Sequence, residues 1–288
     1  MGKAVSLANQ KGGVGKTTTA VNLAAALCKK GQSVLLIDLD PQGNASSGLG
    51  FDSSMREVNI YNVLIGQIDL ADIIRPTSVS GLDMVLSSSD LYGAEVELVN
   101  DYSRSTKLRR HVHAVRGRYD FVLIDCPPSL GLLTVNALAA SDSLVVPLQA
   151  EYYAMEGLSQ LMRTVGLIQA GLNPNLKVEG ILLTMFDVRN NLCHQVENEI
   201  RNYFGRQVFR TKIPRNVRLS ECPSFGVPIF DYDPTSKGAQ SYQALADEFL
   251  ARNGAPVESD AETKGDIQEN EGSGPSRAMP EQGDSEHG

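Results

Sequence analysis

Short apolar runs alternate along the chain with longer segments whose apolar positions recur at helical spacing. Several runs, such as VLLID and FVLID, are apolar throughout, which is typical of strands covered on both faces. Strands are expected over Ala4–Ala8, Ser33–Asp38, Leu82–Ser87, Phe121–Asp125, Ser143–Pro147 and Val178–Thr184, with shorter ones over Val208–Ile213 and Pro228–Phe230. Helices are expected over Thr17–Lys29, Leu91–Asn100, Thr106–Arg116, Leu132–Ala140, Met155–Ala170, Leu192–Phe204 and Ser236–Arg252. This alternation predicts an α/β fold with a mostly parallel, twisted sheet flanked by helices.

Composition divides the chain into two parts. No linker interrupts residues 1–253, which we expect to form a single domain, and residues 254–288 form an acidic tail. From Pro256 to Gly288 there are nine acidic and two basic residues, so most of the net charge of -8 lies in this segment. It is rich in Gly, Ser, Pro and Glu and poor in large apolar residues, which predicts disorder. The domain itself is nearly neutral, so the total charge does not exclude a nucleic-acid partner.

Membrane and redox signals point to an intracellular protein. No apolar run approaches the ~18 residues that a membrane span needs, and the N-terminus lacks the apolar stretch of a secretory signal. The cytoplasm is therefore the expected location. The cysteines are scattered and form no CxxC pair, which favours neither a disulfide framework nor a zinc site. They are Cys28, Cys126, Cys193 and Cys222.

A glycine-rich loop, NQKGGVGKTT, joins the first predicted strand to the first helix. Its glycines let backbone N–H groups approach a triphosphate closely, and the following helix adds its positive end. Lys16 would reach the β- and γ-phosphates, Thr17 would supply a hydroxyl to Mg²⁺, and Thr18 would donate to the α-phosphate. The expected phosphate-binding residues are Gly12, Gly13, Val14, Gly15, Lys16, Thr17 and Thr18.

Aspartates end two of the buried strands. Asp38 and Asp40 are two residues apart and can project from the same side of an extended segment. Asp125 follows four apolar residues, and its carboxylate would hold Mg²⁺ through water or together with the Thr17 hydroxyl. Oxygen ligands and phosphates, with no His or Cys cluster, favour Mg²⁺ over other metals. Asp38 could lie near the water shell of the metal or cap the next turn, and the sequence leaves both open.

The motifs resemble, in order, those of ParA/Soj-type chromosome-partitioning ATPases, which belong to the ParA/MinD group with a deviant Walker A loop. They read KGGVGKTT, LIDLDPQGN, LIDCPPSLG, VVPLQAEYYAMEGL, GILLTMFD and IPRN. In the general pattern GxxxxGK[ST], a glycine would stand where this chain has Gln10. The resemblance implies ATP with Mg²⁺ and a homodimer formed on ATP binding. It also implies that Lys11 reaches the partner's phosphates and that Asp40 orients the attacking water.

The same resemblance assigns residues outside the loop. Met185, Pro214 and Asn216 would enclose the adenine, although Met185 could equally pack in the core. Arg189 and Arg218 would bind nonspecific double-stranded DNA, although exposed arginines are often only solvated or salt-bridged. A ParB-type centromere-binding protein would stimulate slow hydrolysis, and the protein would be associated with the nucleoid. The resemblance also leaves open a role in replication initiation.

Three rival functions predict different features. A MinD-like membrane-associated positioning ATPase needs a basic amphipathic C-terminal helix, whereas the last 33 residues here are acidic and polar, so no membrane partner is expected. An electron-transfer protein related to the nitrogenase iron protein needs paired cysteines for an iron–sulfur cluster. Cys126 follows Asp125, but no partner pattern is visible. A nucleotide-binding scaffold without turnover would not depend on Asp40.

Overall fold

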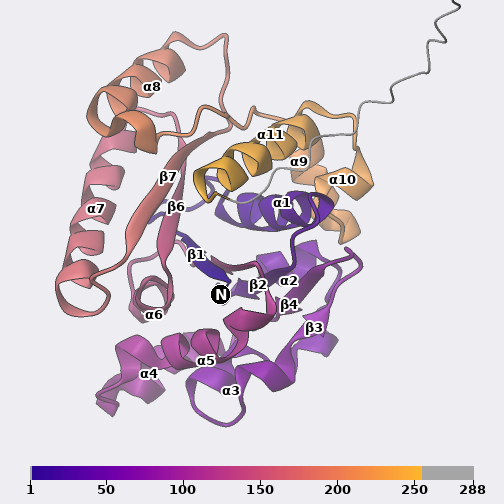
Figure 1. The fold of residues 1–288 in the computed structure, drawn as a ribbon, viewed down its shortest axis with the longest axis vertical. Coiled ribbons are helices and arrows are strands. Elements are labelled where there is room, and N and C mark those ends of the chain that lie inside the picture. Colours follow the sequence, from indigo (N-terminus) through magenta and orange to yellow (C-terminus); the bar gives the residue numbers. More distant parts are fainter. Residues whose placement is uncertain (1, 255–288) are drawn as a thin grey trace, which may run out of the picture. The chain divides into compact units, whose positions relative to one another are not determined.

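The computed structural model describes residues 2–254 and shows one α/β domain built on a seven-stranded sheet (Figure 1). The strand order is β3-β4-β2-β5-β1-β6-β7, and only the β3–β4 pair is antiparallel. The strands are β1 (Lys3–Leu7), β2 (Val34–Asp38), β3 (Arg75–Pro76), β4 (Leu82–Val85), β5 (Phe121–Asp125), β6 (Ser143–Gln149) and β7 (Lys177–Thr184). The predicted α/β class is confirmed. The predicted disorder of the acidic tail concerns a segment almost wholly outside the described residues.

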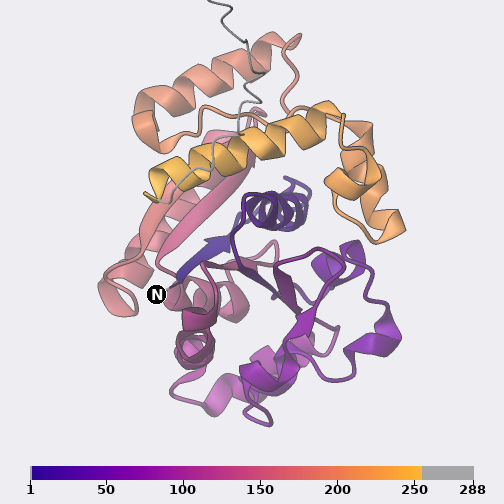
Figure 2. The ribbon, with the colours of Figure 1, turned by 45° about the vertical axis from the view of Figure 1, so that its right-hand side comes forward.

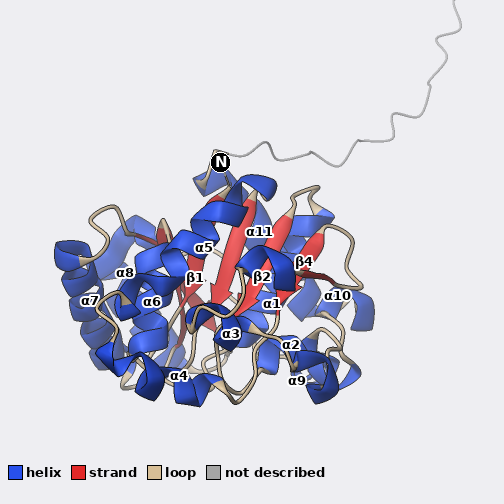
Figure 3. Cartoon of the chain, turned by 90° about the horizontal axis from the view of Figure 1, so that it is seen from below, coloured by secondary structure: helices blue, strands red, loops and turns tan. Residues whose placement is uncertain are grey.

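Helices cover both faces of the sheet (Figures 2 and 3). They are α1 (Lys16–Lys29), α2 (Asn44–Gly48), α3 (Ile60–Leu64), α4 (Leu91–Glu97), α5 (Lys107–Val115), α6 (Leu132–Ala140), α7 (Ala154–Gly171), α8 (Asn191–Phe204), α9 (Val217–Glu221), α10 (Ile229–Tyr232) and α11 (Lys237–Arg252). One apolar core joins the sheet to α1, α10 and α11, and the other joins it to α3 through α8. Strand β2 shows why: Leu35 and Ile37 belong to one core, and Val34 and Leu36 belong to the other. Alternating side chains of a wholly apolar strand thus fill both cores.

The predicted strand over Val208–Ile213 is wrong. This segment runs beside β7, and Phe209 N–H donates to the Ile181 carbonyl at 2.9 Å, but only one isolated bridge forms. The next two amides turn away, because Arg210 N–H and Thr211 N–H donate to the Glu248 carboxylate of α11 at 2.8 and 2.9 Å. A side-chain acceptor therefore replaces the ladder that a strand would need.

The predicted strand over Pro228–Phe230 is also wrong, since Ile229 and Phe230 lie in helix α10. Both side chains are buried, so the segment is apolar for reasons of packing alone. Pro228 precedes the first helical residue, and Ile229 N–H donates to Asn22 Oδ1 of α1 at 2.8 Å. An apolar run this short does not distinguish a strand from a helical turn.

Candidate functional site

The glycine-rich loop lies at the carboxyl end of β1, an interior strand between β5 and β6. Gly13 and Gly15 adopt φ angles of 71° and 82°, which favour glycine. The loop is fixed from both sides: Asn9 Nδ2 donates to the Pro147 carbonyl at 2.7 Å, and Thr184 Oγ1 donates to the Val14 carbonyl at 2.7 Å. The loop backbone is therefore preorganised to bind an anion.

Lys16 begins α1 and is nearly buried, with 6% of its surface exposed. Its Nζ donates to the Lys11 carbonyl at 3.1 Å, which holds the side chain back across the loop. Burial lowers the pKa of Lys16, while the charges of Asp125 and Asp40 oppose that shift. A buried cation of this kind gains most from a densely charged anion placed beside it.

The two strand-end aspartates Asp38 and Asp125 are register neighbours on β2 and β5, and both are buried. Asp38 Oδ2 accepts hydrogen bonds from Ser46 N–H and Ser46 Oγ, each at 2.8 Å, so Asp38 anchors α2. Burial raises the pKa of Asp38 to about 6 despite these bonds. Asp38 therefore caps the first turn of α2 through Ser46, and its proximity to the water shell of a metal stays a prediction.

Asp125 has a different environment. Within residues 2–254, no donor reaches either of its buried oxygens with hydrogen-bond geometry. Burial and the neighbouring Asp38 raise its pKa well above the usual range, while Thr17 and Lys16 favour the charged form. The nearby Lys16 charge therefore offsets only part of the cost of burying this carboxylate, which lacks a well-aligned hydrogen-bond donor. Asp125 and the Thr17 hydroxyl therefore fit the requirements of an oxygen-ligated divalent cation.

Asp40 lies at the rim of the site, only 6% exposed. Its Oδ1 accepts the Gln42 N–H at 3.0 Å, and its backbone carbonyl accepts the Ser87 hydroxyl at 2.6 Å. These two bonds fix the loop that follows β2, so the carboxylate is held in a defined orientation rather than left free in solvent.

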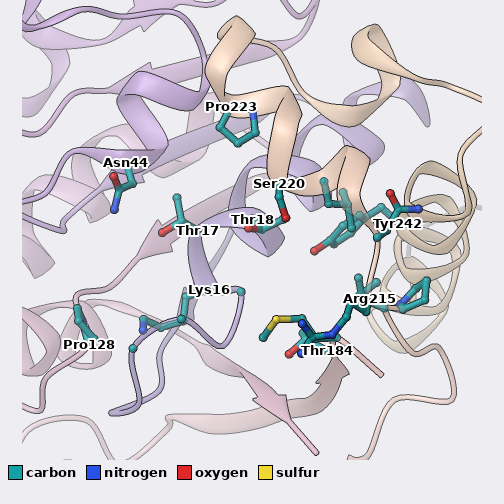
Figure 4. Close-up of a pocket in the computed structure, with 18 of the residues that line it drawn as sticks. Lys16, Thr17, Thr18, Asn44, Pro128, Thr184, Arg215, Ser220, Pro223 and Tyr242 are labelled. Carbon is teal, nitrogen blue, oxygen red and sulfur yellow. The ribbon is translucent and has the colours of Figure 1, made fainter. Parts of the chain in front are cut away.

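A cavity of about 470 Å³ opens beside the loop and contains most of the predicted site. Figure 4 shows Lys16, Thr17 and Thr18 on one side and Thr184 and Arg215 on another. The predicted residues on its wall are Gly12, Gly13, Gly15, Lys16, Thr17, Thr18, Asp40, Met185, Pro214 and Asn216. Val14 and Asp125 are buried and do not line the cavity.

The predicted base-binding residues come from two loops that are held together. Phe186 N–H donates to the Ile213 carbonyl at 3.0 Å, and Arg215 N–H donates to the Phe186 carbonyl at 3.3 Å. Met185 is the one non-glycine residue within 2–254 with a positive φ, 47°. A methionine in the left-handed backbone region is strained, and the hydrogen bonds between the two loops stabilise Met185 in this conformation. Asn216 Oδ1 accepts Arg218 N–H at 2.8 Å and caps α9.

Lys11, Arg189 and Arg218 lie outside this cavity and are accessible. Lys11 is about half exposed and forms an ion pair with Glu151. Arg189 is 87% exposed and pairs with Asp187, whose pKa it lowers to about 2. Arg218 pairs with Glu221 and also lies near Asp233. The side chains of these three residues do not line the nucleotide cavity.

The sequence prediction missed several wall residues. Thr184 ends β7 and Pro128 follows the Asp125 strand, so the rule that ligands lie at the carboxyl ends of strands could have found both. No local signal marked Tyr242, which reaches the cavity from α11 near the end of the domain. Arg215 directly follows Pro214 and also lines the cavity.

The chain is similar to known nucleotide-binding proteins. The model of the AAA domain family matches residues 2–178. The crystal structure of cobyrinic acid a,c-diamide synthase from Mycobacterium smegmatis with bound ADP and magnesium is 36% identical, with a TM-score of 0.78 over 88% of this chain and 96% of that chain. The fold and the loop thus define a nucleotide-binding ATPase of the P-loop type.

The particular family follows from closer relatives. The sporulation initiation inhibitor protein Soj of Bacillus subtilis is 56% identical over 87% of this chain and 99% of the relative. The chromosome partitioning protein ParA of Myxococcus xanthus is 55% identical over 88% of this chain and 89% of the relative. This chain belongs to the ParA/Soj family of chromosome-partitioning ATPases, as the motifs predicted.

The rival MinD type is a more distant relative. The cell division ATPase MinD of Pyrococcus furiosus is 27% identical, with a TM-score of 0.72 over 87% of this chain and 99% of that chain. Within residues 2–254, no helix combines the length and the apolar character needed to cross a membrane.

Proposed function

We propose that this chain is an ATP-dependent partitioning switch, in which an ATP-bound dimer binds nonspecific double-stranded DNA. The observation that carries the proposal is the buried Asp125 carboxylate, without a donor in the described domain, beside Thr17 and the buried Lys16. The test is phosphate release from ATP by the purified protein with Mg²⁺ and with excess EDTA. Release should require Mg²⁺, and equal release with EDTA would contradict the metal assignment.

Each residue of the site would have a separate role in phosphoryl transfer. Lys16 and the amides of Gly13 and Gly15 would bind the β- and γ-phosphates, and Thr17 with Asp125 would hold Mg²⁺. When bound, Mg²⁺ would neutralise charge on the phosphate oxygens. The Asp40 carboxylate, held by Gln42, would orient the attacking water. Transfer of this kind is catalysed mainly by positioning and by electrostatic stabilisation.

The wall of the cavity opposite the loop suits the base. Met185 and Pro214 offer apolar surface to a planar ring, and the Asn216 amide nitrogen remains available to a base edge because its oxygen caps α9. We assign adenine as the base because the chain belongs to a family of ATPases. The phosphates would then lie on the glycine-rich loop.

Lys11 is proposed to act in the partner subunit. Its amine is half exposed and lies outside the cavity, so it is accessible to a second copy of the chain. A cation supplied in trans to the charge that develops on the phosphates would link hydrolysis to dimerisation. Release from Glu151 costs little, since exposed ion pairs contribute about 0–1 kcal/mol.

Gly12→Val is expected to bind ATP but to remain monomeric. A Cβ at Gly12 would meet only the Pro128 side chain, at 3.8 Å, and the Gly12 φ angle is not positive, so the subunit should fold normally. The added bulk lies on the exposed loop, where the partner would approach. Size-exclusion chromatography with a nonhydrolysable ATP analogue measures the outcome. A dimer of wild-type size would contradict the proposed interface.

Arg189→Glu is expected to weaken DNA binding while leaving ATP binding unchanged. Nonspecific binding depends on phosphate neutralisation, and the Arg189 side chain is 87% exposed and does not line the nucleotide cavity. Fluorescence anisotropy with a duplex, with ATP present, should show at least a severalfold loss of affinity. Arg163→Glu on α7 is the matched charge reversal, since Arg163 is exposed. An equal loss in both variants would show a general charge effect.

The proposal includes a ParB-type partner that accelerates hydrolysis and a nucleoid-associated location, both of which follow from the family. It also includes the division of the chain into an ATPase domain, residues 1–253, and an appended acidic segment, residues 254–288. The second arginine, Arg218, is proposed as a further DNA contact. It would have to exchange its carboxylate partners for phosphates on binding.

A further inference from the structure

The described domain ends beside a basic groove of about 1050 Å³. The groove lies at the first residues of β1 and β7, and Arg252, the last residue of α11, is part of its wall. The next residue, Asn253, donates a hydrogen bond from Nδ2 to Glu179 Oε1 on the same wall at 3.0 Å. The chain therefore leaves the domain at the rim of the groove.

The groove is positively charged in a domain that is nearly neutral. Two of its side chains are anionic, Glu179 and Glu248. Six are cationic, which leaves a net charge of four positive units, and they are Lys3, Lys177, Arg201, Arg206, Arg210 and Arg252. The carboxyl ends of α8 and α11 add roughly half a negative charge each, so about three positive charges remain.

Ion pairs within the domain use only part of these cations. The two carboxylates of the groove pair with Lys3 and Arg252, and Glu197 of α8 pairs with Arg201. The other three side chains are exposed and have no hydrogen-bond or ion-pair partner in the described part of the chain. They are Lys177, Arg206 and Arg210.

The sequence that follows the domain has the opposite charge. Residues 258–271, here called the acidic stretch, contain six acidic residues and one lysine, which gives a net charge of five negative units. They are Glu258, Asp260, Glu262, Asp266, Glu269, Glu271 and Lys264. The first carboxylate comes six residues after Arg252, and an extended chain of that length spans up to about 20 Å. The acidic stretch can therefore reach the groove of its own chain.

We infer that the acidic stretch occupies the basic groove of its own chain, where it competes with the phosphates of duplex DNA. About three positive charges on the groove face five negative charges in a stretch that begins six residues beyond its wall. The guanidinium groups of Arg206 and Arg210 can pair with carboxylates through two parallel hydrogen bonds each. The competition with DNA rests on the proposed DNA-binding function, whereas the contact between the stretch and the groove does not.

Covalent connection favours the stretch of the same chain over that of a second copy or an acidic peptide from another protein. Each exposed ion pair is weak, so such a contact would be little populated between separate molecules. A short connection raises the effective concentration to the order of mM, which populates the contact within one chain. Duplex DNA presents its charges more densely, about one per 1.7 Å, so it would displace the stretch. The contact would thus lower the affinity for DNA without preventing binding.

The first test measures the accessibility of Lys177 in the full chain without DNA. A lysine-reactive acyl ester labels the protein, and peptide mass spectrometry measures the rate at Lys177. In a neutral-stretch variant, each Glu of residues 258–271 is replaced by Gln and each Asp by Asn. Labelling of Lys177 should be severalfold faster in this variant than in the wild type. High salt should speed labelling in the wild type alone, since salt screens exposed charges.

Two controls belong to this measurement. In the charge-preserving variant, Glu and Asp are exchanged at the same six positions, and it should label as the wild type does. Lys237 is exposed at the other end of α11, about 22 Å along the helix from Arg252, and its labelling should not change in any variant. Equal labelling of Lys177 in the wild type and the neutral-stretch variant would overturn the inference. Protection of Lys177 that grows with protein concentration would overturn the assignment to the same chain.

The second test measures duplex binding by fluorescence anisotropy with ATP present. The neutral-stretch variant should bind at least about threefold more tightly than the wild type, because it no longer competes for the groove. With Lys177→Ala, Arg206→Ala and Arg210→Ala also present, neutralising the stretch should change the affinity little, since the two sets of changes are coupled. An equal gain in both backgrounds would show a general charge effect and overturn the competition. Faster labelling of Lys177 with no duplex binding by any variant would contradict the proposed DNA-binding function and support the contact with the groove.

Discussion

Lys16→Ala is expected to abolish ATP turnover and to remove most of the affinity for ATP. Lys16 is the cation buried within the loop, and its Nζ already points along the loop backbone to the Lys11 carbonyl. Phosphates bound there would exchange that neutral acceptor for a charged one, and charge-assisted bonds are roughly twice as strong. Loss of one such preorganised donor costs about 10²–10³ in rate. Phosphate release and binding of a fluorescent ATP analogue measure both effects.

The matched control for Lys16→Ala is Lys29→Ala. Lys29 lies in the last turn of the same helix, above the ring of Phe230, and takes no part in the cavity. It removes the same charge from the same helix, and it should retain wild-type turnover. Turnover by Lys16→Ala within a fewfold of the wild type would refute the assignment of this loop to the phosphates.

Strand order and register explain why the candidate site could be predicted so far from the sequence. The site residues directly follow strands that the sequence pattern predicts clearly. Strands β2 and β5 are apolar at every position up to their aspartates. In a parallel sheet those ends meet at one edge, and Asp38 and Asp125 are indeed register neighbours. The glycine-rich loop needed only its position after β1. These parts of the site depend on local pattern and on one rule of topology.

Other parts depend on contacts between segments that are distant in sequence. The Glu248 carboxylate accepts hydrogen bonds from the amides of Arg210 and Thr211, so the expected strand does not form there. No residue near position 210 in the sequence indicates that this acceptor is present. Gly180 is another case, because a Cβ at this position would collide with the ring of Phe209. The hydrogen bond from Ser46 N–H to the Asp38 carboxylate is closer in sequence, at a separation of eight residues, but the pattern of the strand does not predict it either.

Asp40→Ala is expected to separate ATP binding from hydrolysis. The Asp40 carboxylate accepts Gln42 N–H and lines the cavity, while the Ser87 bond to the Asp40 carbonyl is unaffected by the substitution. The loop should therefore keep its path, and the phosphates and Lys16 are untouched. A positioned carboxylate contributes about 10²–10⁴ to proton transfer in rate. We expect phosphate release to fall by about two orders of magnitude or more, while ATP-dependent dimerisation in size-exclusion chromatography persists.

Asp40→Asn distinguishes orientation of the loop from charge at the water. Its side-chain oxygen can still accept from Gln42, so the loop is held as in the wild type, but the amide is a far weaker base. If charge matters, Asn and Ala should be equally slow, and both should accumulate as ATP-bound dimers. If Asn restores turnover, Asp40 acts only by holding the loop. Unchanged phosphate release in both variants would remove Asp40 from the mechanism, and a monomeric Asp40→Ala protein with ATP bound would break the link between nucleotide and dimer.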